Sequence, residues 1–465
     1  MTATKNERTL AYHFERTLNE ILSKNALSLP EQGLAVAYSG GLDSSVLLAL
    51  ANQFCQKHKI PLFAFHVHHG LSINADAWLR HCASVCALSG VTFAGVKVIV
   101  DRQSKDGIES SAREARYKAL GALCQERQLP IILTAHHQDD QAETVLLQLL
   151  RGSGVAGLSG MDLSNKAPKL LGSDTVMLAR PLLRVTRQSL LDYSEEATIA
   201  YVDDESNADQ RYARNALRHQ VMPVLSVISP GYTERLARSA SHAQSTNRLL
   251  TELARQDRSV CEIDGALDIN LLRNYSADRI DNLLRFWLGE QGVRMPTTAR
   301  LTEMRHQLFD GRDDAKISVF HDTLGIHRYK NKIYASPKDV VKGSEITPIQ
   351  FSWNGEPSIP FLSYGGTLYF EECSTGVDLT WLKQQVLTIH PRQGGERLKL
   401  AFNRPTRDIK SHYQTLKIPF WQRERLPFIS AGSKLLFAAG VGMESAFFTD
   451  DANVKICIKW ESDAN

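Results

Sequence analysis

The first 150 residues alternate between short apolar runs and longer stretches in which apolar residues recur every three or four positions. The short runs have the length of strands, and the longer stretches have the periodicity of amphipathic helices. Strands are expected over 34–37, 62–68, 91–100 and 130–135, and helices over 9–24, from 46 onward, and over 75–89, 110–127 and 139–150. Strands that alternate with helices pair in parallel, so we expect a parallel sheet covered on both faces.

Beyond residue 225 the pattern changes. A polar, charged helical stretch covers 231–258, amphipathic helices cover 271–288 and 298–308, short strands cover 316–335, and β-like segments cover 336–387. We therefore predict an α/β protein with three domains. These are an N-terminal parallel-sheet domain over 1–225, a mainly helical middle domain over 226–340 and a small α+β C-terminal domain over 341–465.

Composition limits the expected partners and location of the protein. A formal net charge of +3 over 465 residues is too small to identify a nucleic-acid partner, so any basic surface must be local. Seven cysteines, an odd number in a long chain, argue against a disulfide framework and for a reducing compartment. No apolar run approaches the roughly 20 residues of a membrane span, and residues 1–8 lack the apolar core of a signal peptide. We expect a cytoplasmic protein without membrane contact.

The strand over 34–37 leads directly into the motif SGGLDSS at residues 39–45. A strand-to-helix junction presents unpaired backbone N–H groups, and the helix dipole favours an anion there. The two glycines let the backbone approach a ligand, the serines supply donors, and Asp43 suits a Mg²⁺ ion beside a phosphate. The alternative is a serine-rich cap of an ordinary helix. The chain has no Gly-Lys-Ser/Thr, so the motif is not a Walker A loop.

A second group of candidate residues lies on the helix over 110–127. Ser111 and Glu114 have the spacing of a capping box, and Arg113, Arg116 and Tyr117 share one helix face. Two arginines near a phosphate site would neutralise its charge or hold an RNA backbone. The alternative is a solvated basic face.

A third group lies at the next strand-to-helix junction, over 134–144. Asp140 stands four residues after His136 and three before Glu143. Acids beside a phosphate site make sense where a magnesium ion or an amine has to be held. The alternative is that Asp139 and Asp140 only complement the helix dipole.

Other residues near these three candidate groups also form recognisable patterns. Arg211, Arg214 and Arg218 follow helical spacing, either as phosphate ligands or as surface ion pairs with the acids at 203–205. The pattern G-x-G-x-x-G at 152–157 follows a helix instead of a strand, so we predict a helix end and a flexible loop over the site, not a dinucleotide site. His66 and His68 are too few for a metal site, and Cys82 and Cys86 are interpreted as core thiols.

The segment 392–425 is the most basic of the chain, with nine Lys or Arg and three Asp or Glu, a local net charge of +6. Aromatic residues are interleaved with these charges, a combination that suits phosphate contact and base stacking. The alternative, favoured for Phe420 and Trp421, is a small core beneath a solvated face.

The motif at 39–45 resembles the PP-loop of the ATP-pyrophosphatase superfamily, whose members split ATP into AMP and pyrophosphate. The segments 109–117, 134–144 and 151–158 also resemble superfamily signatures. The segments 180–219, 271–335 and 392–427 resemble one family in it, the tRNA(Ile)-lysidine synthetases. The resemblance covers most of 30–220, 270–330 and 390–445.

This resemblance implies an ATP- and Mg²⁺-dependent ligase that joins free lysine to the wobble cytidine of tRNA(Ile) with a CAU anticodon, through an adenylated cytidine; a homodimer is a further expectation. It implies ATP contacts at Ser39, Gly40, Gly41, Leu42, Asp43, Ser44 and Ser45, with Asp43 also for Mg²⁺, and catalytic roles for Asp43, Arg113, Asp140 and Glu143. It implies tRNA or phosphate contacts at Arg116, Tyr117, Arg214, Arg218, Arg392 and Lys410.

Three alternatives stay open. A tRNA thiolase of the same superfamily needs reactive cysteines, and the one near pair, Cys82 and Cys86, is predicted on a helix away from the loops. An amidotransferase synthetase would need a glutaminase domain, for which no motif is present. An inactive RNA-binding protein would not need the intact PP-loop motif, and ATP binding would distinguish it.

Overall fold

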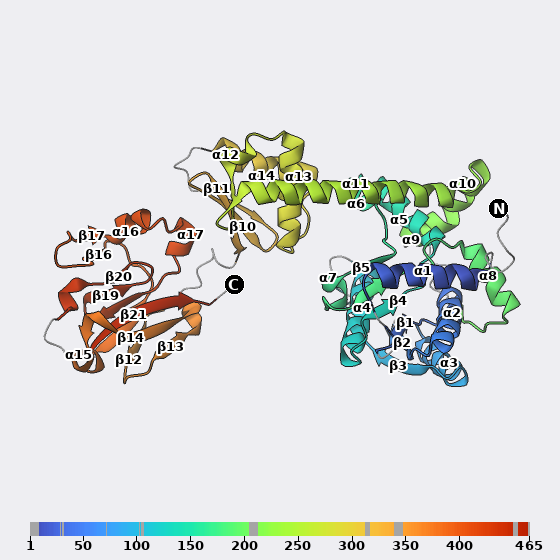
Figure 1. Cartoon of the computed structure of the whole chain (residues 1–465), viewed down its shortest axis with the longest axis horizontal. Coiled ribbons are helices and arrows are strands. Elements are labelled where there is room, and N and C mark those ends of the chain that lie inside the picture. The colour runs from blue at the N-terminus through green and yellow to red at the C-terminus, as the bar shows by residue number, and fades with distance from the viewer. Residues whose placement is uncertain are drawn as a thin grey trace. The chain divides into compact units, whose positions relative to one another are not determined.

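The computed structural model describes residues 9–27, 29, 32–70, 72–101, 103, 107–203, 213–311, 317–338, 347–449 and 454–463. The chain divides into two compact units, Met1–Leu249 and Leu250–Asn465. Figure 1 shows the long helix α11 (Tyr232–Cys261), which contributes residues to both units. Each unit is described below by itself.

The N-terminal unit is built on a six-stranded sheet with the order β3-β2-β1-β4-β6-β5. Neighbouring strands pair in parallel except for β5, which is antiparallel to β6. The strands are β1 (Leu34–Ala37), β2 (Leu62–His68), β3 (Thr92–Lys97), β4 (Ile131–Leu133), β5 (Ser164–Lys166) and β6 (Met177–Ala179). The predicted parallel sheet is confirmed.

Helices cover both faces of this sheet. One core cluster joins the sheet to α1 (Leu10–Lys24), α2 (Leu42–His58), α3 (Ala75–Leu88) and α8 (Arg187–Glu196). A second cluster, on the opposite face, joins it to α4 (Ile108–Glu126) and α7 (Pro168–Leu171). The remaining helices are α5 (Gln138–Leu150), α6 (Val155–Leu158), α9 (Ala213–Ala216), a π-helical turn (Leu217–Val221) and α10 (Met222–Ile228).

The second unit begins with a five-stranded antiparallel sheet and three helices. The sheet order is β7 (Glu262–Ile263), β8 (Ala266–Asp268), β11 (Lys332–Pro337), β10 (Leu324–Tyr329) and β9 (Ile317–His321), and the helices are α12 (Ile269–Leu272), α13 (Ala277–Glu290) and α14 (Thr298–Asp310). Ser276 and Thr297 cap α13 and α14 with their hydroxyl oxygens. The two predicted helices and the short strands are present, and β7 and β8 add to the sheet.

The rest of the second unit is mainly antiparallel. One sheet has the order β12 (Ile349–Ser352), β15 (Val386–His390), β18 (Phe428–Ala431), β19 (Lys434–Ala438) and β20 (Gly442–Met443). The others are β13 (Ser358–Phe361), β14 (Gly366–Asp378) with β21 (Lys455–Ser462), and β16 (Arg397–Leu398) with β17 (Arg407–Asp408). The short helices are α15 (Leu379–Lys383), α16 (Ile409–Thr415) and α17 (Phe420–Arg423).

Two sequence expectations for this region can be compared with the structure. Trp421 is buried, whereas Phe402 is 63% exposed, so the core interpretation holds for Trp421. One disulfide joins Cys373 and Cys457, on β14 and β21, while the five other cysteines are free and buried. The chain therefore has no disulfide framework but does have one bridge, which the odd cysteine count could not indicate.

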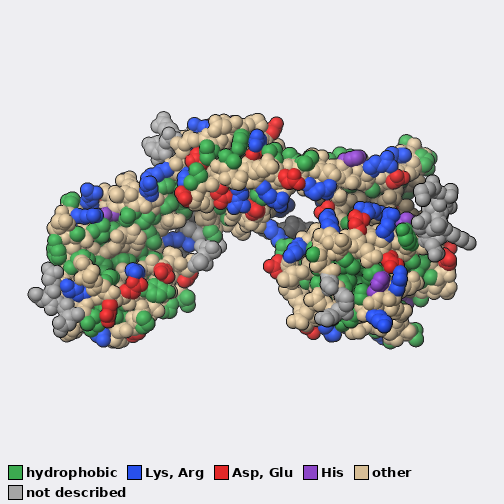
Figure 2. All heavy atoms as spheres, in the orientation of Figure 1, with side chains coloured by type: hydrophobic (Ala, Val, Ile, Leu, Met, Phe, Trp, Pro, Cys, Tyr) green, Lys and Arg blue, Asp and Glu red, His purple; other side chains and the backbone are tan. Residues whose placement is uncertain are grey.

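The surface carries charged side chains of both signs, in line with the small net charge of the chain. Figure 2 shows Lys and Arg side chains spread over both units and mixed with Asp and Glu on the displayed face. Among the described residues, none of the helices is both long and apolar enough to cross a membrane.

Candidate active site

Residues 39–45 lie at the predicted strand-to-helix junction: 39–41 connect β1 to α2, and 42–45 form the first turn of α2. Gly41 caps α2 in an extended conformation, and Gly40 has a φ of +90°, which glycine adopts without steric cost. A Cβ atom on Gly40 would lie 2.9 Å from the Cys82 sulfur, and the Gly40 carbonyl accepts a 2.9 Å hydrogen bond from the Val202 N–H. Close packing from two sides therefore requires glycine at this position.

The three serines of the motif have different tasks. Ser44 Oγ donates to the Gly41 carbonyl at 3.0 Å and lies 2.9 Å from Ser39 Oγ. Ser45 is buried, and its hydroxyl donates to the Gly40 carbonyl at 3.2 Å. Ser39 and Ser44 line the pocket. Ser45 does not line it and instead stabilises the loop through its bond to Gly40.

Asp43, in the first turn of α2, has a polar atom that lacks a partner. Its Oδ1 is buried without a hydrogen bond, and its Oδ2 lies 3.6 Å from His137 Nε2. An unpartnered carboxylate oxygen facing a pocket fits a cation, and Mg²⁺ is commonly held by one or two carboxylates together with substrate phosphates. The residues present thus fit the expected Mg²⁺.

His137 connects three carboxylates at the start of α5. Its ring nitrogens lie 3.6 Å from Asp43, 3.6 Å from Asp139 and 3.4 Å from Asp140. Burial lowers the pKa of His137, but the neighbouring carboxylates of Asp139 and Asp43 outweigh burial and raise the pKa to about 10. His137 is therefore a cation at neutral pH, and it offsets part of the negative charge beside the PP-loop.

The stability of the protein should depend on pH through His137. A pKa raised on folding stabilises the folded state below the unfolded pKa of about 6.5, and this contribution is lost as pH rises towards 10. The difference in melting temperature between the wild type and His137→Gln should therefore be largest at pH 6 and shrink steadily up to pH 10. A difference that does not change over this range would contradict the charged state of His137.

Asp140 and Glu143 on α5 form a four-membered ion-pair network with two arginines. Arg214 donates to Glu143 at 2.6 Å and to Asp140 at 2.9 Å. Arg218 donates to the second Glu143 oxygen at 2.6 Å and to Asp140 at 3.4 Å. Glu143 is fully buried, so its charge depends on both arginines. The predicted acids and the predicted arginines are thus partners of each other.

Arg113 and Arg116 are held on an aromatic support. Their guanidinium carbons lie 4.9 Å and 5.3 Å from the centre of the Tyr117 ring, which is buried. These cation–π contacts fix two positive charges on the side of α4. The helix begins at Ile108 after Gly107, so the predicted capping box at Ser111 is wrong; Glu114 instead pairs with Lys118 at 2.6 Å.

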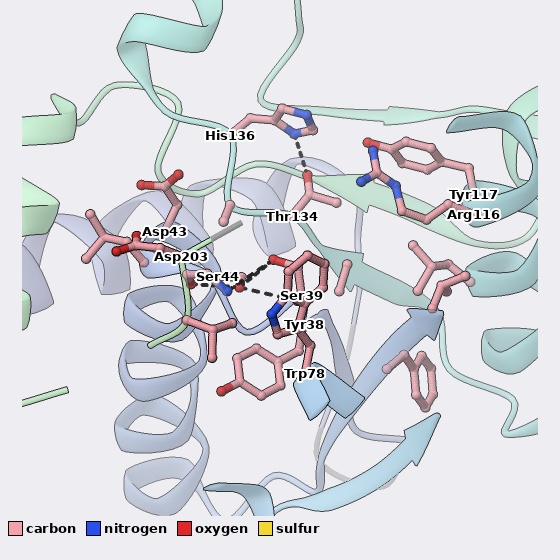
Figure 3. A pocket seen from close by; sticks show the side chains of 18 of the residues that line it. Tyr38, Ser39, Asp43, Ser44, Trp78, Arg116, Tyr117, Thr134, His136 and Asp203 are labelled. Atoms are coloured by element: carbon pink, nitrogen blue, oxygen red, sulfur yellow. Dashed lines mark hydrogen bonds between the residues drawn. The ribbon is translucent and has the colours of Figure 1, made fainter. Parts of the chain in front are cut away.

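A pocket of about 360 Å³ lies at the carboxyl ends of β1, β2 and β4. Figure 3 shows Ser39, Asp43 and Ser44 on one side of it and Arg116 and Tyr117 on another. This volume is in the range of small-molecule sites, and the place is where open parallel sheets bind ligands.

His136 adds a neutral polar group to this pocket. Its Nδ1 lies 2.9 Å from the Thr134 hydroxyl, as Figure 3 shows. Burial, together with the nearby guanidinium groups of Arg180 and Arg113, holds the pKa of His136 well below its usual range. The two adjacent histidines therefore differ in charge, because one faces arginines and the other faces carboxylates.

Comparison with known proteins covers most of the chain. The chain matches three family models. They are described as PP-loop domain over residues 10–225, TilS substrate binding domain over 267–334 and TilS substrate C-terminal domain over 387–460. It is 37% identical over 464 residues to the tRNA(Ile)-lysidine synthase of Burkholderia pseudomallei (strain K96243), covering 93% of this chain and 94% of that one. The chain belongs to the tRNA(Ile)-lysidine synthase family.

Other members of the synthase family agree with this assignment. The identity is 39% over 424 residues with the tRNA(Ile)-lysidine synthase of Ralstonia nicotianae (strain ATCC BAA-1114 / GMI1000), covering 88% of each chain. It is 37% over 406 residues with that of Coxiella burnetii (strain RSA 493 / Nine Mile phase I), covering 87% of this chain and 88% of the other.

Most of the residues predicted for the synthase family come together in one place. The pocket is lined by Ser39, Gly41, Leu42, Asp43, Ser44, Arg116, Tyr117 and Arg218. Gly40 and Ser45 shape the loop, and Arg113, Asp140, Glu143 and Arg214 contact the lining residues or their neighbours. Arg392 and Lys410 lie exposed in the second unit.

Two local expectations are corrected or refined. The segment 152–157 does not line the pocket; its residues 155–157 belong to α6, and beyond this helix the Met161 N–H donates to Gln141 Oε1 at 2.8 Å. Cys82 is on α3 as expected but packs against the PP-loop, because α3 and α2 share one face of the sheet. Arg211 and the acids at 204–205 lie outside the described residues. Among the described residues, no cluster of three or more His, Cys, Asp or Glu could hold a metal ion.

Sequence reasoning assigned no role to three side chains that line the pocket. Trp78 comes from the first turn of α3, Arg187 from α8 and Asp203 from the segment that contacts Gly40. The Arg187 N–H donates to Asp139 at 2.9 Å. No local pattern signals Trp78, because it stands within α3, beyond the end of β2 at His68, and the packing of α3 decides where it lies.

Proposed function

We propose that this chain is an ATP-dependent ligase that joins free lysine to C2 of the wobble cytidine in the CAU anticodon of tRNA(Ile). The product, lysidine, pairs with A in place of G and changes the codon read from AUG to AUA. The observation that carries the proposal is the pocket where the PP-loop meets Arg116 and Arg218, with the acid pair Asp140 and Glu143 held behind Arg218, in a chain related to tRNA(Ile)-lysidine synthases over most of its length. We also propose a cytoplasmic location, since ATP and tRNA are available there.

In the first step the 2-carbonyl oxygen of the cytidine attacks the α-phosphorus of ATP, and pyrophosphate leaves. Charge develops on the phosphate oxygens, so preorganised donors contribute most to the rate. The N-terminus of α2, the hydroxyls of Ser39 and Ser44 and the guanidinium of Arg116 line the pocket and supply such donors. Mg²⁺ held by Asp43 would neutralise phosphate charge.

In the second step the ε-amine of lysine attacks C2 and AMP leaves. Asp140 and Glu143 are the acids available for the amine, and their exposure differs. The oxygens of both acids accept hydrogen bonds, those of Glu143 from the two arginines and those of Asp140 from the arginines and the His137 backbone N–H. The Glu143 side chain is 1% exposed, whereas the Asp140 side chain is 13% exposed. We therefore assign the lysine amine to Asp140, and we assign Glu143 the task of holding Arg214 and Arg218.

The exposed basic residues of the second unit suit the tRNA backbone. Arg392 and Lys410 belong to the segment with a local net charge of +6, and both are exposed. Single-residue losses there should weaken binding of all tRNAs without changing the chemistry at the PP-loop.

A thiolase is disfavoured by the state of the cysteines. The five free cysteines are buried, and burial raises the pKa of the Cys82 thiol to about 12. A thiol with that pKa is not a thiolate at neutral pH and is a poor sulfur carrier.

The test is lysine incorporation into RNA. The protein is mixed with ATP, Mg²⁺, radiolabelled lysine and bulk bacterial tRNA, and acid-precipitable label is counted before and after mild alkali. A carbon–nitrogen bond on a base survives alkali, whereas an aminoacyl ester does not. Stable, ATP-dependent label is expected. Absence of label with tRNA-dependent pyrophosphate release would contradict lysine as the nucleophile.

A further inference from the structure

The pocket lining is polar near β1 and β4 and apolar near β2. The PP-loop after β1 and the junction after β4 contribute hydroxyl, carboxylate and imidazole groups. On the β2 side, the lining residues Phe65, Val67, Trp78 and Leu120 are apolar. A ligand that places its phosphates at the PP-loop therefore meets an apolar surface at its other end.

The apolar side is a slot between two helices on opposite faces of the sheet. Trp78 belongs to α3, which packs in the same core cluster as α2, and Leu120 belongs to α4, which packs on the opposite face. Phe65 and Val67 of β2 pack with Leu120 on the α4 face and line the pocket. Phe65, Val67 and Leu120 are buried in the core, whereas Trp78 is only half-buried. Trp78 thus offers a free aromatic surface to a ligand.

Trp78 is held in place by the packing of α3. The backbone N–H of Trp78 donates to the Asn74 carbonyl at 3.0 Å in the first helical turn. The next residue, Leu79, packs so closely on β3 that a Cβ atom on Gly95 would lie 2.5 Å from its methyl carbon, and Cys82 is fully buried one turn further. The backbone that carries Trp78 is therefore fixed by the packing of its neighbours, which limits the positions open to the indole and lowers the entropic cost of stacking.

We propose that Trp78 is the residue that selects the nucleotide base, by stacking its indole on the purine ring of the triphosphate. The inference rests on the proposed use of ATP at the PP-loop. A fused two-ring purine covers more of an indole than a pyrimidine does, so the residue should favour purine over pyrimidine triphosphates. Trp78 contacts the base alone and leaves the phosphate contacts to the PP-loop.

The decisive comparison is between ATP and inorganic tripolyphosphate, which carries the phosphates without a base. Dissociation constants are measured by calorimetry with Mg²⁺ for the wild type, Trp78→Ala, Trp78→Leu and, as a control in the second unit, Trp460→Phe. We expect Trp78→Ala to weaken ATP about tenfold and to leave tripolyphosphate within twofold. Trp78→Leu, which keeps apolar volume, should weaken ATP by a similar factor, and Trp460→Phe should change neither constant.

Stacking also has a signature in the unaltered protein. The fluorescence of 2-aminopurine riboside triphosphate should be quenched on binding to the wild type, and the quenching should be largely lost in Trp78→Leu. In steady-state assays KM for ATP should rise about tenfold while kcat changes less than threefold, and the preference for ATP over CTP should fall.

The outcomes separate this inference from the proposed function. If Trp78→Ala and Trp78→Leu bind ATP as well as the wild type, or lose ATP and tripolyphosphate in parallel, Trp78 does not read the base. If the wild type binds neither ATP nor tripolyphosphate, the PP-loop assignment fails and the inference fails with it. If ATP binds and Trp78 behaves as expected but no lysine is incorporated, the base-reading role stands and only the lysine chemistry is wrong.

Discussion

Replacing Asp43 with asparagine is expected to lower tRNA-dependent pyrophosphate release by about 100- to 1,000-fold. Asp43 Oδ1 is a buried oxygen without a hydrogen-bond partner, and it faces the pocket where the phosphates are proposed to bind. The amide keeps the shape of the side chain but removes the charge that would hold Mg²⁺. Losses of this size are typical when one preorganised electrostatic contact is removed from an active site.

The measurement is a coupled pyrophosphate assay at several Mg²⁺ concentrations. The Mg²⁺ concentration for half-maximal rate should rise in Asp43→Asn, because the cation loses a protein ligand. Asp192→Asn serves as the control, since Asp192 is exposed on α8 and its oxygen accepts only from Gln188 at 2.7 Å among the described contacts. A normal rate in Asp43→Asn, with an unchanged Mg²⁺ requirement, would remove Asp43 from the mechanism.

Replacing Glu143 with glutamine should destabilise the N-terminal unit and also impair lysine transfer. Both oxygens of this fully buried carboxylate accept from guanidinium groups, and an amide NH₂ in place of one oxygen would face a donor. Breaking a buried ion pair costs about 3–5 kcal/mol. Because the side chains of Arg214 and Arg218 are 28% and 32% exposed, water compensates part of the loss, and we expect about 2–3 kcal/mol.

The stability loss is measured by thermal unfolding monitored by far-UV circular dichroism. We expect a lower melting temperature of the N-terminal unit in Glu143→Gln. Lysine transfer should fall about 100-fold, since Arg218 lines the pocket and both arginines lose their anchor. Glu114→Gln is the matched control, because Glu114 forms an exposed pair with Lys118 on α4 and should change stability by less than about 0.5 kcal/mol. Equal stability of the Glu143 and Glu114 variants would contradict the structural importance of the network.

The charge state and the pairing of each ionisable side chain in the site depend on its surroundings more than on its residue type. His136 and His137 are neighbours in the chain, yet burial and arginines hold the pKa of one well below its usual range, while carboxylates raise the pKa of the other to about 10. The spacing of Arg214 and Arg218 allows phosphate ligands or surface ions; in the structure both pair with Asp140 and the buried Glu143, and Arg218 also lines the pocket. Such pairings depend on contacts 70 or more residues apart in the chain.

By itself, the sequence determined the parallel sheet of the N-terminal unit, the position of the PP-loop between β1 and α2, and the family. These features follow from local patterns: strand and helix periodicity, glycine at a crowded turn with a φ of +90°, and motifs of adjacent residues. The tertiary structure alone decided that Glu143 anchors two arginines, that Cys82 packs on the PP-loop and that Trp78 faces the pocket. The physical reason is that burial and long-range pairing set charge states and free surfaces, and neither is encoded in the spacing of neighbouring residues.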